Sequence, residues 1–132
     1  MERFSYAGVS IGGTFGRQLA LTVPDRLEEP AIIAFAARFA DPPSWAATPA
    51  EGCAACCEAI GALDVRDRLG DIAAPTLVVA GAEDPATPGD TVRLLADGIP
   101  DSEFTVVPGA AHLPDATHPQ AVNAALREHL GG

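Results

Sequence analysis

A serine flanked by glycines lies near the start of the chain, in the segment Gly8-Val9-Ser10-Ile11-Gly12. The residues before it can form a strand, and the residues after it have the pattern of a helix. A serine on a sharp strand-to-helix turn exposes its hydroxyl, and flanking glycines avoid collisions where the strand passes into the helix. The pattern predicts that Ser10 is a nucleophile. The alternative is a small turn residue, because a G-x-S-x-G segment also arises by chance in a chain with 13 glycines.

An acid and a histidine, Asp84 and His112, follow two later strands of the expected fold. Serine is a weak nucleophile at neutral pH, so it needs an adjacent base. His112 would take the proton of Ser10 and later return it to the leaving group, while Asp84 would fix the imidazole tautomer and stabilise its charged form. The backbone N–H of Ile11, at the start of the helix, would donate to the oxyanion. We therefore predict a catalytic triad with one oxyanion donor.

The acid and the histidine both have rivals in the sequence. Glu83 precedes Asp84, but Asp84 is favoured because the proline that fixes the turn comes directly after it. His118 falls at a helix start and His129 at a helix end, where a histidine commonly caps the helix or is solvated. His112 follows a Gly-Ala-Ala loop straight after a strand, which favours it as the base.

Strands and helices alternate along the chain. The expected strands are Phe4–Val9, Ala31–Ala36, Thr76–Ala80 and Glu103–Val107. The expected helices are Gly13–Val23, one from Thr48 to about Leu63, a short Asp64–Leu69, one capped by Thr87-Pro88-Gly89-Asp90, and a final one capped by Thr117 or His118. Apolar strands alternating with helices predict an α/β fold, a mostly parallel sheet of about four strands flanked by helices. Since ligands bind beyond the carboxyl ends of such strands, the predicted triad would meet at that edge.

Two helices have an apolar face that we expect to be buried. In the first helix this face consists of Phe15, Leu19 and Val23. In the last it consists of Val122, Ala125, Leu126 and Leu130. Both sets recur at the helical period, which is typical of helices that pack on a sheet.

Composition excludes several classes of protein. The 132 residues suit one domain, and a hydrophobic content of 48% argues against disorder. The net charge of -10 argues against binding to nucleic acid or to an anionic membrane surface. No apolar run is long enough to cross a bilayer, and the first residues lack the pattern of a signal peptide. Composition therefore predicts a cytoplasmic protein whose partners are neither nucleic acid nor membrane.

The three cysteines are Cys53, Cys56 and Cys57. A zinc site needs a fourth ligand, usually from a second pair, and the sequence offers no such pair. At helical spacing the cysteines share a face with Ile60, which favours small apolar core residues instead. We expect no metal site.

Three stretches, 8–13, 75–88 and 106–113, together with the order serine, aspartate, histidine, are similar to the last four strands of the α/β-hydrolases. Further stretches resemble the 3-oxoadipate enol-lactonases within that superfamily. They are Ala36-Ala37-Arg38, Pro43-Ser44-Trp45, the run from Pro49 to Ile60, and Asp64-Val65-Arg66-Asp67-Arg68-Leu69. The resemblance implies opening of an enol-lactone ring by water to give 3-oxoadipate, in the β-ketoadipate route of aromatic breakdown. It implies no metal and no organic cofactor.

The substrate that this resemblance implies carries a carboxylate, so a nearby cation is expected. Arg38, at the carboxyl end of the second strand, is the candidate, with a surface arginine paired to an acid as the alternative. Trp45 would wall the substrate pocket or simply pack the loop.

The sequence departs from this family in two places. Only residues 1–7 precede the serine turn, where the family has about four strands and a His-Gly loop that supplies a second oxyanion donor. Most of the helical cap that follows the second strand also has no counterpart here. We therefore expect a single truncated domain over residues 1–132 with an open strand edge. Either copies of the chain associate along this edge, or a missing N-terminal half covers it. A related esterase and a non-catalytic fragment are the alternative hypotheses.

Overall fold

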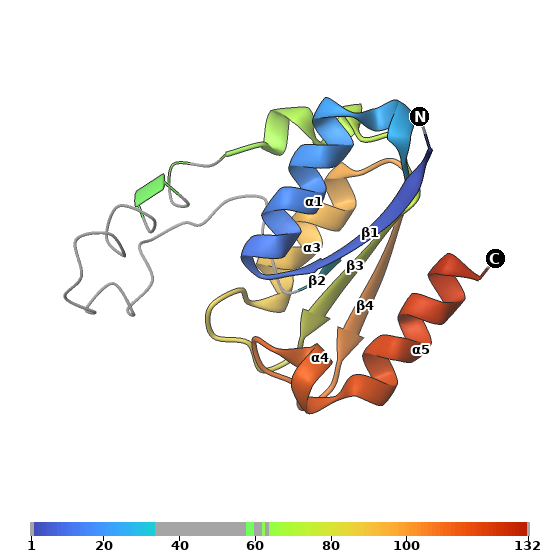
Figure 1. Cartoon of the computed structure of the whole chain (residues 1–132). Coiled ribbons are helices and arrows are strands. Elements are labelled where there is room, and N and C mark those ends of the chain that lie inside the picture. The colour runs from blue at the N-terminus through green and yellow to red at the C-terminus, as the bar shows by residue number, and fades with distance from the viewer. Residues whose placement is uncertain (1, 34–57, 60–61, 63, 132) are drawn as a thin grey trace.

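Four strands form one parallel sheet in the computed structural model, which describes residues 2–33, 58–59, 62 and 64–131. The strands are β1 (Phe4–Val9), β2 (Leu27–Ile33), β3 (Thr76–Gly81) and β4 (Ser102–Val107). All neighbouring pairs are parallel, in the order β1-β2-β3-β4 (Figure 1). The predicted four-stranded parallel sheet is confirmed. β2 begins four residues before the expected Ala31, and its expected end at Ala36 lies outside the described residues.

Helices connect and follow these strands. They are α1 (Ile11–Thr22), η1 (Pro24–Arg26), η3 (Arg66–Asp71), α3 (Gly89–Gly98), α4 (Pro114–Thr117) and α5 (Pro119–Leu130). α1 begins at Ile11 rather than at Gly13, because it starts directly after the serine turn. The short helix expected over 64–69 is the 3-10 helix η3. The helix expected from Thr48 lies almost entirely outside the described residues. No helix in the described ranges is both long and apolar enough to span a membrane.

The strand order decides which face each helix covers. Because the strands neighbour one another in chain order, right-handed crossovers place every connecting helix on the same face of the sheet. α1 contacts β1 and β2, and α3 contacts β3 and β4, on that face (Figure 1). α5 follows the last strand and packs on the opposite face, against β2, β3 and β4. The prediction of helices on both faces is confirmed.

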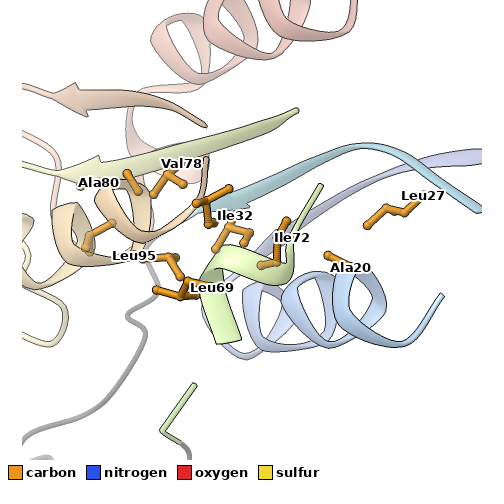
Figure 2. Packing of buried hydrophobic residues seen from close by; sticks show 11 residues of the cluster. Ala20, Leu27, Ile32, Leu69, Ile72, Val78, Ala80 and Leu95 are labelled. Atoms are coloured by element: carbon orange, nitrogen blue, oxygen red, sulfur yellow. The ribbon is translucent and has the colours of Figure 1, made fainter. Parts of the chain in front are cut away.

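A hydrophobic core fills the space between the sheet and its helices. Figure 2 shows its larger part, a cluster that includes Ile32 and Val78 of the sheet, Ala20 of α1, Leu95 of α3 and Leu69 of η3. A second cluster lies beneath α5 and includes Ala31, Val79 and Val122. Each fully buried aliphatic side chain of this size stabilises the fold by roughly 1.5–3 kcal/mol. The core therefore holds the carboxyl ends of all four strands in register.

The expected buried faces of two helices are wrong in part. Phe15 of α1 is 58% exposed, whereas Leu19 packs against the core as expected. The buried residues of α1 are Gly13, Gly16, Arg17 and Ala20. Small residues let the helix axis approach the strands closely, and the ring of Tyr6 occupies the space beneath Gly16. In α5, Val122 is buried and Leu126 is partly buried as expected, but Leu130 is 44% exposed and its neighbour His129 is buried instead.

Candidate active site

The serine lies on a strained turn between β1 and α1. Ser10 has φ 54° and ψ -120°, and it is the only non-glycine residue with positive φ in the described part of the chain. Such a conformation costs about 1–3 kcal/mol and persists only where the surrounding structure holds it. The Ser10 N–H donates to the carbonyl of Ile33 at the end of β2, at 2.9 Å. A Cβ on Gly8 would lie 2.5 Å from the carbonyl carbon and oxygen of Gly12, so this position requires glycine.

Tyr6 braces the same turn, which the sequence reasoning did not predict. Its hydroxyl donates to the carbonyl oxygen of Gly12 at 3.0 Å, tying β1 to the first turn of α1. The signal was present in the alternation of the strand, because Tyr6 and Gly8 lie on the same face of β1.

The histidine reaches the serine through a loop that passes over the end of β3. Two strands separate β4 from β1, so the chain after Val107 must turn back across the sheet edge. Gly109 provides the turn with φ +72°. The Ala110 carbonyl oxygen accepts a hydrogen bond from the N–H of Glu83 at 2.9 Å. A Cβ on Gly81 would lie 2.5 Å from that oxygen and closer still to the Ala111 carbonyl oxygen, so the crossing depends on a glycine in β3.

The three side chains predicted to form a triad lie in one hydrogen-bonded line. His112 Nε2 lies 2.9 Å from Ser10 Oγ, and His112 Nδ1 lies 2.8 Å from Asp84 Oδ2. With the proton on Nδ1, that N–H donates to Asp84 while Nε2 accepts the serine hydroxyl, which is the tautomer a general base needs. The geometry suits proton transfer from the serine to the histidine.

The carboxylate of Asp84 is buried and fully engaged. Its side chain has no exposed surface, and its Oδ1 accepts the N–H of Ala86 at 2.8 Å and the N–H of Thr87 at 3.0 Å. Oδ2 accepts the Thr87 hydroxyl as well as His112. Burial alone would raise the pKa of Asp84. The hydrogen bonds from the Thr87 hydroxyl, from His112 and from the two backbone N–H groups outweigh burial, so the pKa lies below its ordinary value. The group stays ionised at neutral pH.

The rival residues lie away from this line. Glu83 is exposed, whereas Asp84 is buried against the histidine. His118 Nδ1 pairs with the hydroxyl of Thr117 at 2.9 Å. His129 was expected to cap a helix or to be solvated, and this is wrong because its side chain is 3% exposed, with Nδ1 3.8 Å from Glu103 Oε2.

Thr87 was expected to help cap the following helix, and this is also wrong. Pro88 occupies the N-cap position of α3, where no side chain makes a capping hydrogen bond. The hydroxyl of Thr87 bonds to Asp84 instead, so the residue belongs to the site.

Several predicted residues stay predictions. Ile11 is the first residue of α1, so its backbone N–H precedes the hydrogen-bonded turns of the helix, as an oxyanion donor requires. Arg38 and Trp45 lie outside the described residues, as do the three cysteines at 53, 56 and 57. Within the described ranges, no group of three or more His, Cys, Asp or Glu side chains is placed to hold a metal ion.

Comparison of the sequence with known protein families identifies the family of the chain. The sequence pattern of the Alpha/beta hydrolase family matches residues 4–125, which is nearly the whole chain. The chain belongs to this family. It is 29% identical over 165 residues to 3-oxoadipate enol-lactonase 2 of Acinetobacter baylyi, covering 92% of this chain and 61% of that protein.

Solved structures have the same fold. An enol-lactonase from Burkholderia xenovorans LB400 superposes with a TM-score of 0.85 at 24% identity, covering 98% of this chain and 66% of that one. A thermophilic esterase from Thermogutta terrifontis gives a TM-score of 0.81 at 24% identity, with coverages of 98% and 65%. At this level of identity the two superpositions establish the fold alone.

The chain is shorter than these hydrolases. It spans 61% of the Acinetobacter lactonase and 66% of the Burkholderia structure. The stretch aligned with the Acinetobacter lactonase, 165 residues, is longer than the 132 residues of this chain. The relative therefore carries residues inside the aligned region that have no counterpart here.

Proposed function

We propose that the chain is a serine hydrolase that opens the ring of 3-oxoadipate enol-lactone to give 3-oxoadipate. The observation that carries this proposal is the hydrogen-bonded line from Ser10 through His112 to Asp84, with the serine on a strained turn. The similarity to the Acinetobacter lactonase supports the choice of substrate. The cytoplasmic location and the place in aromatic breakdown are further parts of the proposal.

Each of the predicted site residues has a role in the proposed reaction. Ser10 Oγ attacks the lactone carbonyl carbon while its proton passes to His112 Nε2, and Asp84 stabilises the imidazolium that results. The backbone N–H of Ile11 donates to the oxyanion of the tetrahedral intermediate, an interaction typically worth about 2.7–4 kcal/mol. When the intermediate collapses, the ring C–O bond breaks and the leaving enolate takes a proton to become a ketone. Water, activated by His112, then attacks the acyl-serine, and the acid is released.

Arg38 would bind the carboxylate of the lactone. It follows β2, whose carboxyl end lies beside Ser10, since the Ser10 N–H bonds to the carbonyl of Ile33. An arginine is suited to this task because its guanidinium can donate two hydrogen bonds to a carboxylate. Trp45 would wall the pocket beside it.

A second candidate is an esterase with an apolar acyl group. Ile11 and Leu113 directly follow the nucleophile and the base, and their side chains are 49% and 50% exposed. Exposed apolar side chains next to a reactive serine suit an apolar substrate group better than a charged one. The esterase from Thermogutta terrifontis shares the fold that would allow this activity.

The decisive experiment measures hydrolysis of the enol-lactone and of a series of p-nitrophenyl esters by the purified chain, by Ser10→Ala and by Ser5→Ala. Ser5 is an exposed serine on β1, so its alanine variant controls for loss of a hydroxyl elsewhere. We expect Ser10→Ala to lower kcat at least about 10³-fold, as removal of a triad nucleophile does. Ser5→Ala should retain the rate of the unmodified chain.

The substrate series separates the hypotheses. A kcat/KM for the enol-lactone well above that for every ester supports the lactonase, and the reverse order supports the esterase. Equal rates for the unmodified chain and Ser10→Ala contradict a serine mechanism altogether. A folded chain that turns over neither class of substrate supports the third hypothesis, a non-catalytic fragment.

A further inference from the structure

Thr87 lies behind the acid of the predicted triad. Its side chain is buried, at 1% exposure, and its hydroxyl donates to Asp84 Oδ2. Its own backbone N–H donates to the other oxygen, Oδ1, at 3.0 Å. One residue therefore contacts both oxygens of the carboxylate.

The two oxygens of Asp84 are held in different ways. Oδ1 is fixed by the backbone N–H groups of Ala86 and Thr87, and this contact depends only on the turn. Oδ2 faces His112 Nδ1 at 2.8 Å, and it is this oxygen that the Thr87 hydroxyl also contacts. The terminal torsion of an aspartate is broad, so a carboxylate held through one oxygen can still pivot. The hydroxyl prevents that pivot at the oxygen that orients the base.

We propose that Thr87 is a positioning residue for the hydrolytic reaction, whose hydroxyl fixes Asp84 Oδ2 in the place that holds the His112 imidazole toward Ser10. This inference rests on the proposed function. The hydroxyl and the N–H of Thr87 both bond to Asp84, so the residue acts through that carboxylate. Because the hydroxyl is buried, water cannot readily replace it when it is removed.

Two physical effects follow from this contact. The first is geometric, since a displacement of about 1 Å in a reacting group can reduce the rate about 100-fold. The second is electrostatic, because burial raises the pKa of Asp84 and the Thr87 hydroxyl is among the donors that lower it. Both effects stabilise one ionised, oriented carboxylate, and both disappear with the hydroxyl.

The test compares Thr87→Val, which keeps the shape and removes the hydroxyl, with Thr87→Ser, which keeps the hydroxyl. Thr91→Val is the matched control, since the Thr91 hydroxyl also lies beside a carboxylate, that of Asp90, on the exposed side of α3. We expect Thr87→Val to lower kcat for p-nitrophenyl acetate about tenfold with little change in KM. Thr87→Ser and Thr91→Val should stay near the unmodified chain.

A spectroscopic measurement accompanies the kinetics and needs no turnover. The proton on His112 Nδ1, bonded to Asp84, should give a far-downfield NMR resonance in the unmodified chain and in Thr87→Ser. This resonance should be lost or broadened in Thr87→Val. Thermal unfolding identifies a variant that fails to fold, and Thr87→Ala then takes the place of the valine variant.

Two results overturn the inference. One is a Thr87→Val variant that folds and keeps both kcat and the downfield resonance. The other is a Thr87→Ser variant as impaired as Thr87→Val, because the effect would then come from lost packing rather than from the hydroxyl. If the unmodified chain and Ser10→Ala hydrolyse the ester equally, the proposed function has failed instead, and the resonance alone decides whether Thr87 orients His112 through Asp84.

Discussion

The carboxylate of Asp84 is hydrogen-bonded to fixed donors of the protein rather than to water. Burying an unpaired charge costs several kcal/mol, yet the side chain of Asp84 has no exposed surface. Two backbone N–H groups, one hydroxyl and one imidazole offset that cost and lower the pKa of the group. The donors favour the ionised form only, so the same arrangement links the stability of the fold to pH.

Acid should therefore weaken the fold through Asp84. Because its folded pKa lies below the ordinary 3.8, its ionised form contributes stability above that pH, and the contribution is lost as the pH falls toward the lower, folded value. We expect Asp84→Asn to reduce the free energy of unfolding by about 1–3 kcal/mol at pH 7 and by less in acid. Urea unfolding over a pH series measures this difference.

Asp97→Asn is the control for that experiment. Asp97 is an exposed acid that pairs with Arg93 at 3.8 Å, so its replacement should change stability little at any pH. A gap between Asp84→Asn and the unmodified chain that stays constant from neutral pH into acid would contradict the linkage.

Among individual residues, the sequence predicts those whose role is indicated by their immediate neighbours in the chain. Ser10, Asp84 and His112 could be identified because each follows a strand with a recognisable turn. Thr87 and Tyr6 were missed although their partners are only three and six residues away, because a turn threonine and a strand tyrosine each fit several roles. A threonine before Pro-Gly-Asp has the pattern of a helix cap, and only the approach of the Asp84 carboxylate shows where its hydroxyl goes.

The position of the loop from β4 to His112 depends on β3, whose end it crosses. Ala110 and Ala111 lie directly over the last residue of β3, Gly81, at a separation that leaves no room for a side chain. The packing of this loop on the end of β3 thus decides where His112 lies.

Gly81→Ala should move that loop. Its new methyl group would meet two backbone carbonyl oxygens, which cannot move aside as a flexible side chain can. We expect a loss of about 1–3 kcal/mol of stability and a fall in kcat of about 100-fold, because His112 is displaced from Ser10. Gly89→Ala, at the start of α3, has no atom within 4 Å of the added Cβ and is the control. Unchanged kcat in a folded Gly81→Ala variant would show that the loop tolerates the shift.

Strands were easier to predict than helix faces. β1 lies where its pattern placed it, and β3 and β4 differ from prediction by one residue at one end. Apolar runs bounded by turns mark buried parallel strands clearly. On α1 the prediction was wrong for Phe15, which is exposed, while Leu19 packs against the core as expected. Hydrophobic periodicity did not indicate the buried residues Gly13, Gly16 and Arg17.

The sheet as a whole has β1 at one edge. Within the described residues, β1 pairs with β2 alone, and α5 contacts β2, β3 and β4 on the far face. Ser5 and Ala7, which point to that face, are exposed. An edge strand presents unpaired backbone groups that can bind another strand. This supports the expectation that copies of the chain, or a partner that completes the sheet, associate along β1.

Ala7→Lys tests that association. A lysine on an edge strand disfavours pairing with a second edge, so the variant should shift the mass measured by light scattering toward the monomer. Ala73→Lys introduces the same charge at an exposed alanine between η3 and β3, away from the edge, and should leave the mass unchanged. A monomeric unmodified chain with a cooperative thermal transition would contradict self-association.

The hydrogen bond between Ser10 and His112 joins residues 102 positions apart. Closing so long a loop carries a large entropic cost, and parallel strands gain their contacts only after such closures, so they fold slowly. The loop that carries His112 follows β4, so the histidine reaches Ser10 only once β4 has docked on β3. If Ser10 is the nucleophile, recovery of hydrolysis during refolding should therefore follow the docking of the last strand.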